Sequence, residues 1–579
     1  MSVLLPQLNS IRTKMDAVNA FYGYDHNLRI KDTSFFDMQN MTGRYSPVIA
    51  SRGKRMKLRT ISKPNGLFAH NHLCWVDGTA FYYNGQQRGT VTDSEKQFVK
   101  MGAYVIIWPD AAYYNTHTNE FGMLGAKTVT TGQVTAKLCR IDGELYDSYP
   151  VSDTQPESPE NGDLWLDTST TPNVLRQYSA LTNVWNAIPT VYTKIEATGI
   201  GAAFEEHDGV TISGFTEDES LNGNFYLVDS GDNYIIIVAL IQNAVSQSGA
   251  VTVERKIPQM DFICESGNRL FGCSSENHEI YASALGSPQN WNRFEETESD
   301  SYAATVGTAG PFTGAIAHQN NVIFLKEHCI HILMGTKPSN FQLETVECRG
   351  VESGSERSMC HINEVLFYKS VEDVCMYGAS FPSKISRALG QHKYKNAVGG
   401  ALGRLYYLCM RNESDESVVF VYDTESDFWV KEDSEDIRWF AALGNELYFL
   451  NEKGELWSVN GSGKEEYGDA TAEKEKDVAW MIETGDIGYE APYNKYISGI
   501  QLYAEGEIGH TVRISIRYDN RMQPWTEVFQ FTPAMRKSMV LPIVPRRCRI
   551  MNIRIHGTGP FKLFSIAKRV EEGSDVYAT

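Results

Sequence analysis

Long apolar runs are missing from this 579-residue sequence. No stretch approaches the ~18 consecutive apolar residues of a membrane-spanning helix, so the sequence predicts no membrane span. The start, Met1–Pro6, has neither a basic flank nor a long apolar core, and we expect no secretory signal there. Helical periodicity is scarce as well, whereas glycine (47 residues) and aromatic side chains (11%) are plentiful. Together these features favour an all-β protein rich in turns.

The cysteines form no Cys-x-x-Cys pair, which gives no support to a zinc site or a disulfide framework. Several of them, including Cys329, Cys375 and Cys409, lie inside apolar segments. We interpret them as small buried side chains of a protein made in a reducing cytoplasm. The full set is Cys74, Cys139, Cys264, Cys273, Cys329, Cys348, Cys360, Cys375, Cys409 and Cys548.

Signatures of catalysis are also missing: there is no glycine-rich phosphate loop, no His-Glu-x-x-His and no Gly-x-Ser-x-Gly. His70 and His72 lie two apart, as on one face of a strand, but without a third ligand we expect no metal site. Asp229–Asn233 is too short for a calcium loop and indicates a hairpin turn. The pair Glu295 and Glu296 could serve a glycosidase but lies in a charged surface run. We therefore expect no enzyme and no cofactor.

Positive charge is in deficit, with 53 Lys and Arg against 72 Asp and Glu, a net charge of −19. Nucleic-acid binding by the overall surface is disfavoured, because phosphate contacts need Lys and Arg; an acidic wall can still confine DNA by repelling it. Two basic clusters stand out, one up to Lys63 and one near the C-terminus. The first could dock an acidic partner or phosphate, or be a solvated strand edge. The second could bind DNA backbone or an acidic neighbour, or be a solvated sheet face. The candidate docking residues are Arg52, Lys54, Arg55, Lys57, Arg59, Arg546, Arg547 and Arg549.

A degenerate repeat is the strongest positive signal. Each copy reads as an apolar run, a short polar turn and a second apolar run that often carries an aromatic residue. Copies recur about every 40 residues, the spacing of four-stranded propeller blades. The sequence thus predicts a β-propeller of about six to seven blades. Clear copies lie at 322–335, 365–378, 404–422 and 446–459.

Composition changes divide the chain. The blade pattern breaks near residue 130 and gives way to a polar, proline-rich stretch at 151–163, which predicts a β module inserted at a blade loop. Apolar residues alternate at 512–518 and 551–556, which predicts a C-terminal β-sandwich. We predict an arm with the first propeller strands (1–65), propeller blades (66–132), the inserted module (133–256), further blades (257–465), a linker (466–479) and the sandwich (480–579).

Three segments resemble a known family. Asn268–Asn292, Gly335–Phe341 and Phe561–Val576 are similar to tailed-bacteriophage propeller proteins of the packaged-DNA stabilisation and tail nozzle (tail hub) type. The resemblance covers most of residues 20–130 and 257–579. Within the insert, Asn161–Asp167 resembles small adhesion-like β modules of phage tail proteins.

The resemblance implies a non-enzymatic virion protein of the tail, made in the host bacterial cytoplasm. It implies a homo-oligomeric ring that contacts portal, adaptor and other tail proteins and extends the tail channel. Such a ring retains packaged DNA and passes it during ejection without sequence-specific contact. The alternative is a tail protein that binds or cleaves host carbohydrate, with residues 133–256 contacting the host surface.

Overall fold

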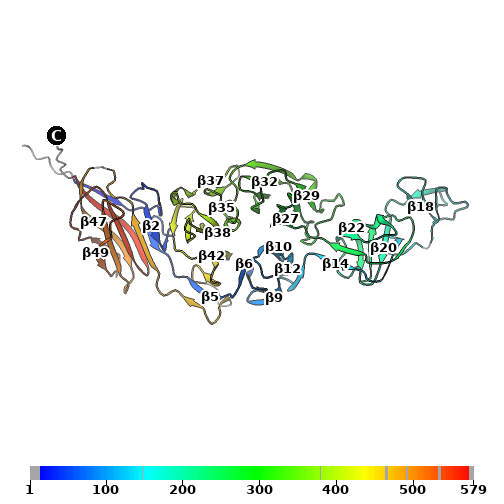
Figure 1. Ribbon diagram of the computed structural model, residues 1–579, viewed down its shortest axis with the longest axis horizontal. Helices are drawn as coiled ribbons and strands as arrows, with labels where there is room; N and C mark the ends of the chain where they lie inside the picture. The colour runs from blue at the N-terminus through cyan, green and yellow to red at the C-terminus, as the bar shows by residue number, and fades with distance from the viewer. Residues whose placement is uncertain are drawn as a thin grey trace, which may run out of the picture. The chain divides into compact units, whose positions relative to one another are not determined.

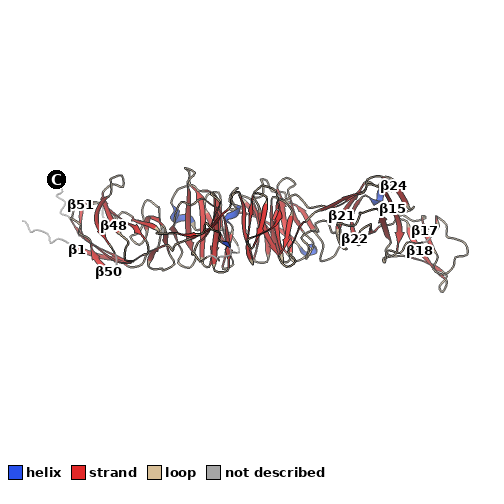
Figure 2. Ribbon diagram, turned by 90° about the horizontal axis from the view of Figure 1, so that it is seen from below, coloured by secondary structure: helices blue, strands red, loops and turns tan. Residues whose placement is uncertain are grey.

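The computed structural model describes residues 13–146, 148–378, 380–462, 467–490, 493–532 and 536–572. Across these ranges the chain is built of strands and turns, with four short 3-10 segments and no α-helix (Figure 2). The expectation of an all-β fold is confirmed. Nothing helical in the described ranges has the length and apolarity needed to cross a membrane. Met1–Pro6 and Gly573–Val576, both used in the sequence analysis, fall outside these ranges. The 3-10 segments are η1 (Glu219–Leu221), η2 (Pro338–Asn340), η3 (Glu356–Ser358) and η4 (Ser386–Leu389).

The chain forms two compact units. Unit 1 comprises residues 1–96, 325–330 and 347–579, and unit 2 comprises residues 97–324 and 331–346.

Blade-type antiparallel sheets of four strands occur in both units, as the repeat predicts. In unit 1 they are β6 (Pro64–His70), β7 (His72–Asp77), β8 (Ala80–Tyr83) and β9 (Gln86–Thr90); β34 (Cys360–Ile362), β35 (Val365–Lys369), β36 (Val374–Tyr377) and β37 (Ser383–Lys384); and β38 (Lys395–Leu402), β39 (Leu405–Arg411), β40 (Ser417–Asp423) and β41 (Phe428–Lys431). In unit 2 they are β10 (Gln97–Met101), β11 (Tyr104–Trp108), β12 (Ala112–Asn115) and β13 (Glu120–Met123); β26 (Phe262–Ser266), β27 (Arg269–Ser274), β28 (Glu279–Ala282) and β29 (Tyr302–Thr305); and β30 (Gly314–His318), β31 (Asn321–Leu325), β32 (Cys329–Met334) and β33 (Gln342–Glu347).

A further blade of unit 1 is completed by the N-terminal part of the chain. It consists of β42 (Ile437–Leu443), β43 (Glu446–Asn451) and β44 (Glu455–Ser458), and its fourth strand is β5 (Met56–Thr60). β5 pairs antiparallel with β44, and the short β45 (Glu473–Lys474) pairs with the other edge of β5. Leu58 of β5 is fully buried in the core of this blade. The blade therefore depends on contacts between residues about 400 positions apart.

Gly454, in the turn between β43 and β44, lets the chain that leaves β5 approach this turn closely. Gly454 has a φ of +78°, and its carbonyl accepts a 2.7 Å hydrogen bond from the Ile61 amide. A Cβ atom at Gly454 would lie 2.0 Å from the Ile61 carbonyl oxygen, which is a backbone clash. Gly444 of the same blade also has a positive φ (+62°), but a Cβ there would meet open space.

We expect Gly454→Ala to destabilise unit 1 by more than Gly444→Ala. Both changes carry the cost of a left-handed residue, about 1 kcal/mol, and Gly454→Ala also forces β5 away from β44. Amide exchange of β5 and β44 in the two variants measures the difference. Equal exchange rates would contradict the role of close approach at Gly454.

The C-terminal β-sandwich of unit 1 contains strands from both ends of the chain. In Figure 1, β2 lies among the strands of the C-terminal region. One sheet comprises β1 (Thr13–Val18), β3 (Met41–Thr42), β4 (Ile49–Ser51), β47 (Lys495–Gly506), β50 (Lys537–Val540), β51 (Arg547–Cys548) and β53 (Phe561–Glu572). The other comprises β2 (Phe35–Gln39), β46 (Ala479–Thr484), β48 (Val512–Tyr518), β49 (Thr526–Phe531) and β52 (Met551–Thr558).

This arrangement differs from the domain boundaries expected from sequence. Residues 13–51, assigned there to an arm and the first propeller strands, instead supply β1 to β4 of the sandwich. Phe35, Met38, Met41 and Ile49 are buried in its core, each at 1% exposure or less. These apolar residues are dispersed over short strands, so that no single window shows a clear period of two.

The insert forms an independent β module of unit 2. It lies between two complete blade sheets, β10–β13 and β26–β29, and has its own apolar core. Its larger sheet begins at Ala126 and ends at Arg255, close to the expected 133–256. This sheet comprises β14 (Ala126–Val129), β15 (Gln133–Cys139), β20 (Tyr192–Glu196), β21 (Gly209–Ser213), β22 (Gly223–Gly231), β23 (Tyr234–Val238), β24 (Val245–Ser248) and β25 (Thr252–Arg255). A smaller sheet comprises β16 (Val151–Ser152), β17 (Leu164–Asp167), β18 (Val174–Ser179) and β19 (Val184–Ala187).

Candidate functional site

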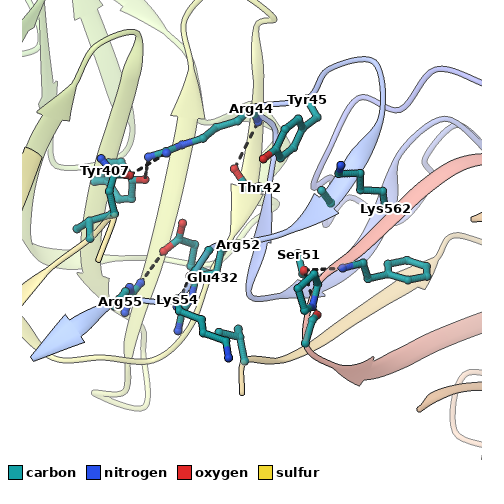
Figure 3. A pocket seen from close by; sticks show the side chains of 18 residues that line it. Thr42, Arg44, Tyr45, Ser51, Arg52, Lys54, Arg55, Tyr407, Glu432 and Lys562 are labelled. Carbon is teal, nitrogen blue, oxygen red and sulfur yellow. Dashed lines mark hydrogen bonds and ion pairs between the residues drawn. The ribbon is translucent and has the colours of Figure 1, made fainter. Parts of the chain in front are cut away.

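The N-terminal basic residues lie where the chain crosses from the sandwich to the blades of unit 1. β4 ends at Ser51 in the sandwich, and β5 begins at Met56 in a blade. Arg52, Lys54 and Arg55 occupy the four-residue crossing, which Figure 3 shows from close by. The crossing has no assigned strand. It is held by backbone hydrogen bonds, from the Arg52 amide to the Asn40 carbonyl at 2.8 Å and from the Glu475 amide to the Arg55 carbonyl at 3.0 Å, and by its side chains.

Arg55 is buried among carboxylates of the segment that follows β41. Its Nη2 lies 2.5 Å from Oε2 of Glu432, and its Nη1 lies 2.7 Å from Oδ2 of Asp433. The side chain of Arg55 is 3% exposed and that of Glu432 is 4% exposed. Burial acts to lower the pKa of Arg55, but the charges of Asp433 and Glu432 outweigh it and raise that pKa. Arg55 is therefore a permanently charged group inside the protein.

Arg52 binds the linker that precedes the sandwich. Its guanidinium donates to both oxygens of Glu475, at 2.7 and 2.9 Å, and its Nη2 lies 3.5 Å from Asp433. This bidentate geometry makes a strong and directional arginine–carboxylate contact. Glu475 also accepts a 2.8 Å hydrogen bond from the backbone amide of Arg55. We name these five residues, Arg52, Arg55, Glu432, Asp433 and Glu475, the ionic clasp.

The other three N-terminal candidates also contact residues of unit 1. Lys57 Nζ lies 2.7 Å from Glu455. Arg59 donates to the Tyr467 carbonyl at 2.7 Å, and its guanidinium carbon lies 4.6 Å from the centre of the Trp75 ring. Lys54 donates to the Lys476 carbonyl and lies 3.6 Å from Asp477, with 37% of its side chain exposed. The structure thus places these cations in contacts within the protein, and the side chain of Lys54 is more exposed than those of Arg52, Arg55 and Lys57.

The C-terminal candidates lie on the sandwich. Arg546, Arg547 and Arg549 are exposed beside β51. The Arg546 guanidinium lies 5.5 Å from the Tyr518 ring centre, and Asp519 accepts the Arg549 backbone amide at 2.6 Å. The structure does not bring these arginines together with the ionic clasp.

Two glutamates of this region have depressed pKa values. Burial acts to raise the pKa of Glu475, but its hydrogen bond to Arg52 and the charge of Arg52 outweigh burial, and that pKa falls below 4.5. Burial is likewise outweighed at Glu455, where hydrogen bonds from Lys57 and Asn451 lower the pKa. Both groups are ionised near neutral pH and stabilise the fold in that form.

We expect unit 1 to lose stability as the pH falls below about 4.5. A carboxylate with a depressed folded-state pKa contributes its stabilisation above the unfolded-state pKa and loses it as the pH falls through the folded-state pKa. Thermal unfolding followed from neutral to acidic pH measures the loss. Glu475→Gln should flatten this dependence, whereas Glu473→Gln, at a 69% exposed side chain, should not. Identical pH profiles for the two variants would contradict this assignment.

A pocket of about 420 Å³ opens beside the ionic clasp (Figure 3). The crossing, the blades and the sandwich all contribute to its wall. Arg44 donates to Oδ1 of Asn460 at 2.8 Å and to the Tyr407 hydroxyl at 3.2 Å. Lys562 lies across the opening, with its Nζ 5.1 Å from the centre of the Tyr45 ring. The remaining wall residues are Thr42, Ala50, Ser51, Arg52, Gly53, Lys54, Arg55, Glu432, Val459, Val478, Gly559, Pro560 and Phe561.

The arrangement at the clasp offers charge and shape rather than reactive groups. Over the described residues, no three His, Cys, Asp or Glu side chains are grouped as metal ligands. The sequence suggested that His70 and His72 lie along one strand, but His70 ends β6 and His72 begins β7. The two residues pair across a hairpin whose turn residue, Asn71, has a φ of +60°.

None of the cysteines in the described ranges forms a disulfide, and a thiol that is buried in apolar surroundings is a poor nucleophile. Burial raises the pKa of Cys139, Cys348 and Cys548 to about 11 in each case. At neutral pH these thiols are protonated, which agrees with their interpretation as small buried side chains.

Sequence reasoning selected the arginines of the clasp but missed what they bind. Glu475 lies in the segment interpreted as a linker, and no local pattern in the sequence connects Asp433 with these arginines. Arg44 and Lys562 were not singled out at all. The one available signal was the excess of cations at residues 52–63 together with acidic runs elsewhere, and it does not reveal which groups meet.

Comparisons with known proteins give a distant structural likeness. No family model matches the sequence, and no curated protein matches it. Among solved structures, the crystal structure of BamB from Moraxella catarrhalis is similar to part of this chain. The similar region covers 53% of this chain and 93% of that chain, with 10% identity and a TM-score of 0.21. A likeness this distant implies no shared function.

Proposed function

We propose that this chain is a structural protein of a bacteriophage tail, whose copies form a ring that extends the tail channel. The ring would contact portal, adaptor and other tail proteins, retain the packaged DNA and pass it during ejection. The resemblance of Asn268–Asn292, Gly335–Phe341 and Phe561–Val576 to nozzle proteins supports this function. The contacts that the residues of the first segment make within a blade support it as well.

The observation that carries the proposal is that the resembling segment builds a blade. Arg269 is 2% exposed and donates to the carbonyls of Ser283 and Asp300, at 2.8 and 2.5 Å. Ser283 accepts the Leu270 amide at 3.0 Å, and the buried Trp291 donates to the Pro288 carbonyl at 2.9 Å. These polar groups bind backbone and have no access to a substrate. They support a scaffold role.

Ring formation is tested by measuring the mass and shape of the purified full-length chain. Light scattering after gel filtration and negative-stain microscopy should show a closed oligomer with a central channel. Microscopy of virions with an antibody against this chain should place it at the tail. A monomer in solution that is also absent from virions would overturn the proposal.

The alternative, a carbohydrate-binding tail protein, is favoured by one surface of the insert. Arg176 pairs with Trp165 across β17 and β18, and Tyr178 pairs with Trp185 across β18 and β19, which places these side chains on one face of the small sheet. Trp185 is partly exposed, and its ring centre lies 5.5 Å from that of Trp165, which is buried at 6% exposure beneath this face. Aromatic rings beside hydrogen-bonding groups suit a sugar ring.

Binding of the full-length chain to host surface glycans tests this alternative. Loss of binding on Trp185→Ala, but not on Val184→Ala from the opposite face of β19, would support it. Absence of glycan binding by the wild-type chain would exclude it.

A further inference from the structure

The pocket beside the ionic clasp has a surplus of positive charge in a chain of net charge −19. Its wall includes five cationic side chains and one carboxylate, Glu432. The carboxylates behind the wall bind Arg52 and Arg55, and Lys54 lies near Asp477. These carboxylates offset Arg52, Lys54 and Arg55, and the cations of the wall that have no carboxylate within hydrogen-bond distance among the described residues are Arg44 and Lys562.

Arg44 is charged but has neutral partners. Over the described residues its guanidinium binds an amide oxygen and a phenol hydroxyl, and no ion pair to a carboxylate is formed. Lys562 is 39% exposed at its side chain and lies 3.8 Å from Glu505, a distance at the limit of an ion pair. The two cations come from different parts of unit 1, the turn after β3 and the start of β53, and lie around the same opening (Figure 3).

A buried donor adds an independent indication. Nε of Arg55, in a side chain that is 3% exposed, has no hydrogen-bond partner, although Arg55 lines the pocket. Buried polar groups in proteins are nearly always hydrogen-bonded, and an orphaned donor calls for an acceptor. An anion bound in the pocket would bring acceptors to the wall to which Arg55 contributes.

We propose that this pocket binds a small organic oxyanion, a phosphate ester or a carboxylate, held by Arg44 and Lys562. A guanidinium presents paired donors that match both groups, and an ammonium adds a point charge. A volume of about 420 Å³ exceeds that of a bare phosphate and lies in the range of small-molecule sites. Because the wall joins blade and sandwich, a bound anion connects both parts of unit 1. This proposal is independent of the tail function.

The test titrates the full-length chain with inorganic phosphate, glycerol phosphate and citrate, with chloride at matched ionic strength as the reference. Calorimetry and the thermal unfolding midpoint give two readouts, since a ligand that binds the folded state raises the midpoint. We expect saturable binding of at least one oxyanion, weakened about tenfold or more in Arg44→Gln and in Lys562→Gln. Arg44→Lys, which keeps the charge but loses the paired donors, should retain part of the affinity.

Arg438→Gln is the matched control. Arg438 is a partly exposed arginine of unit 1 that pairs with Glu452 and does not line the pocket, so its loss should leave the affinity unchanged. Unfolding midpoints without ligand show whether each variant folds. The proposal is overturned if no oxyanion binds more tightly than chloride, or if Arg438→Gln weakens binding as much as Arg44→Gln. Preferential binding of a duplex oligonucleotide over every small anion would also overturn it.

Discussion

Replacing Arg55 by alanine should lower the stability of unit 1 by about 3–5 kcal/mol, the usual cost of breaking a buried ion pair from one side. The substitution leaves Glu432 (4% exposed side chain) and Asp433 (14%) without their buried cation. It also removes the guanidinium beside the Phe449 ring. Because a chain with two units need not unfold in one step, amide exchange of β5 and β44 is the appropriate local measurement.

Lys63→Ala is the control for this prediction. Lys63 belongs to the same basic run but pairs with Asp93 at the surface, where the two side chains are 69% and 46% exposed. Its loss should cost at most about 1 kcal/mol. If exchange in β5 is as slow in Arg55→Ala as in the wild type, the clasp does not hold this strand.

Deleting residues 1–51 should abolish soluble expression of the chain. The deletion removes β1 to β4, and with them Phe35, Met38 and Ile49 from the sandwich core. Loss of a single such side chain costs about 2–5 kcal/mol, and several together exceed the stability of an ordinary domain. Unpaired edges of β46 and β53 would then be open to aggregation. Soluble yield and gel filtration measure the outcome.

Leu28→Ala serves as the comparison. Leu28 lies in the same N-terminal stretch, but its side chain is 93% exposed and not part of the sandwich core. We expect this substitution to leave the yield close to that of the full chain. A soluble, folded protein after deletion of residues 1–51 would show that the C-terminal strands form the sandwich alone.

The sequence predicted the all-β class and the blades, because period-two patterns and turns are local signals. Runs such as Val365–Tyr368 followed by Val374–Tyr377 can be interpreted without knowing what they pack against. The sequence did not predict that Phe35 and Met38 belong with Trp480 and Phe561, because strand pairing across the chain has no local signature.

The candidate site was predicted only in part, because the residues that meet there are also distant in sequence. Arg52 and Arg55 are visible as a basic run, but their burial is decided by Asp433 and Glu475, which are distant in sequence. A charged run at a chain crossing has the same composition as a solvated edge. The tertiary contacts alone distinguish the two.

The pairing of β1 and β4 with β53 sets an order of events during synthesis. A ribosome adds about 5–20 residues per second, so β4 waits roughly half a minute or longer for its partner, which is about 500 residues away. β5 waits nearly as long for β44. Until then the first 60 residues expose apolar strands with no place to pack. The newly made chain therefore depends on β53, and premature termination anywhere before Phe561 yields a product that lacks the strand with which β1, β4 and β47 pair in the sandwich.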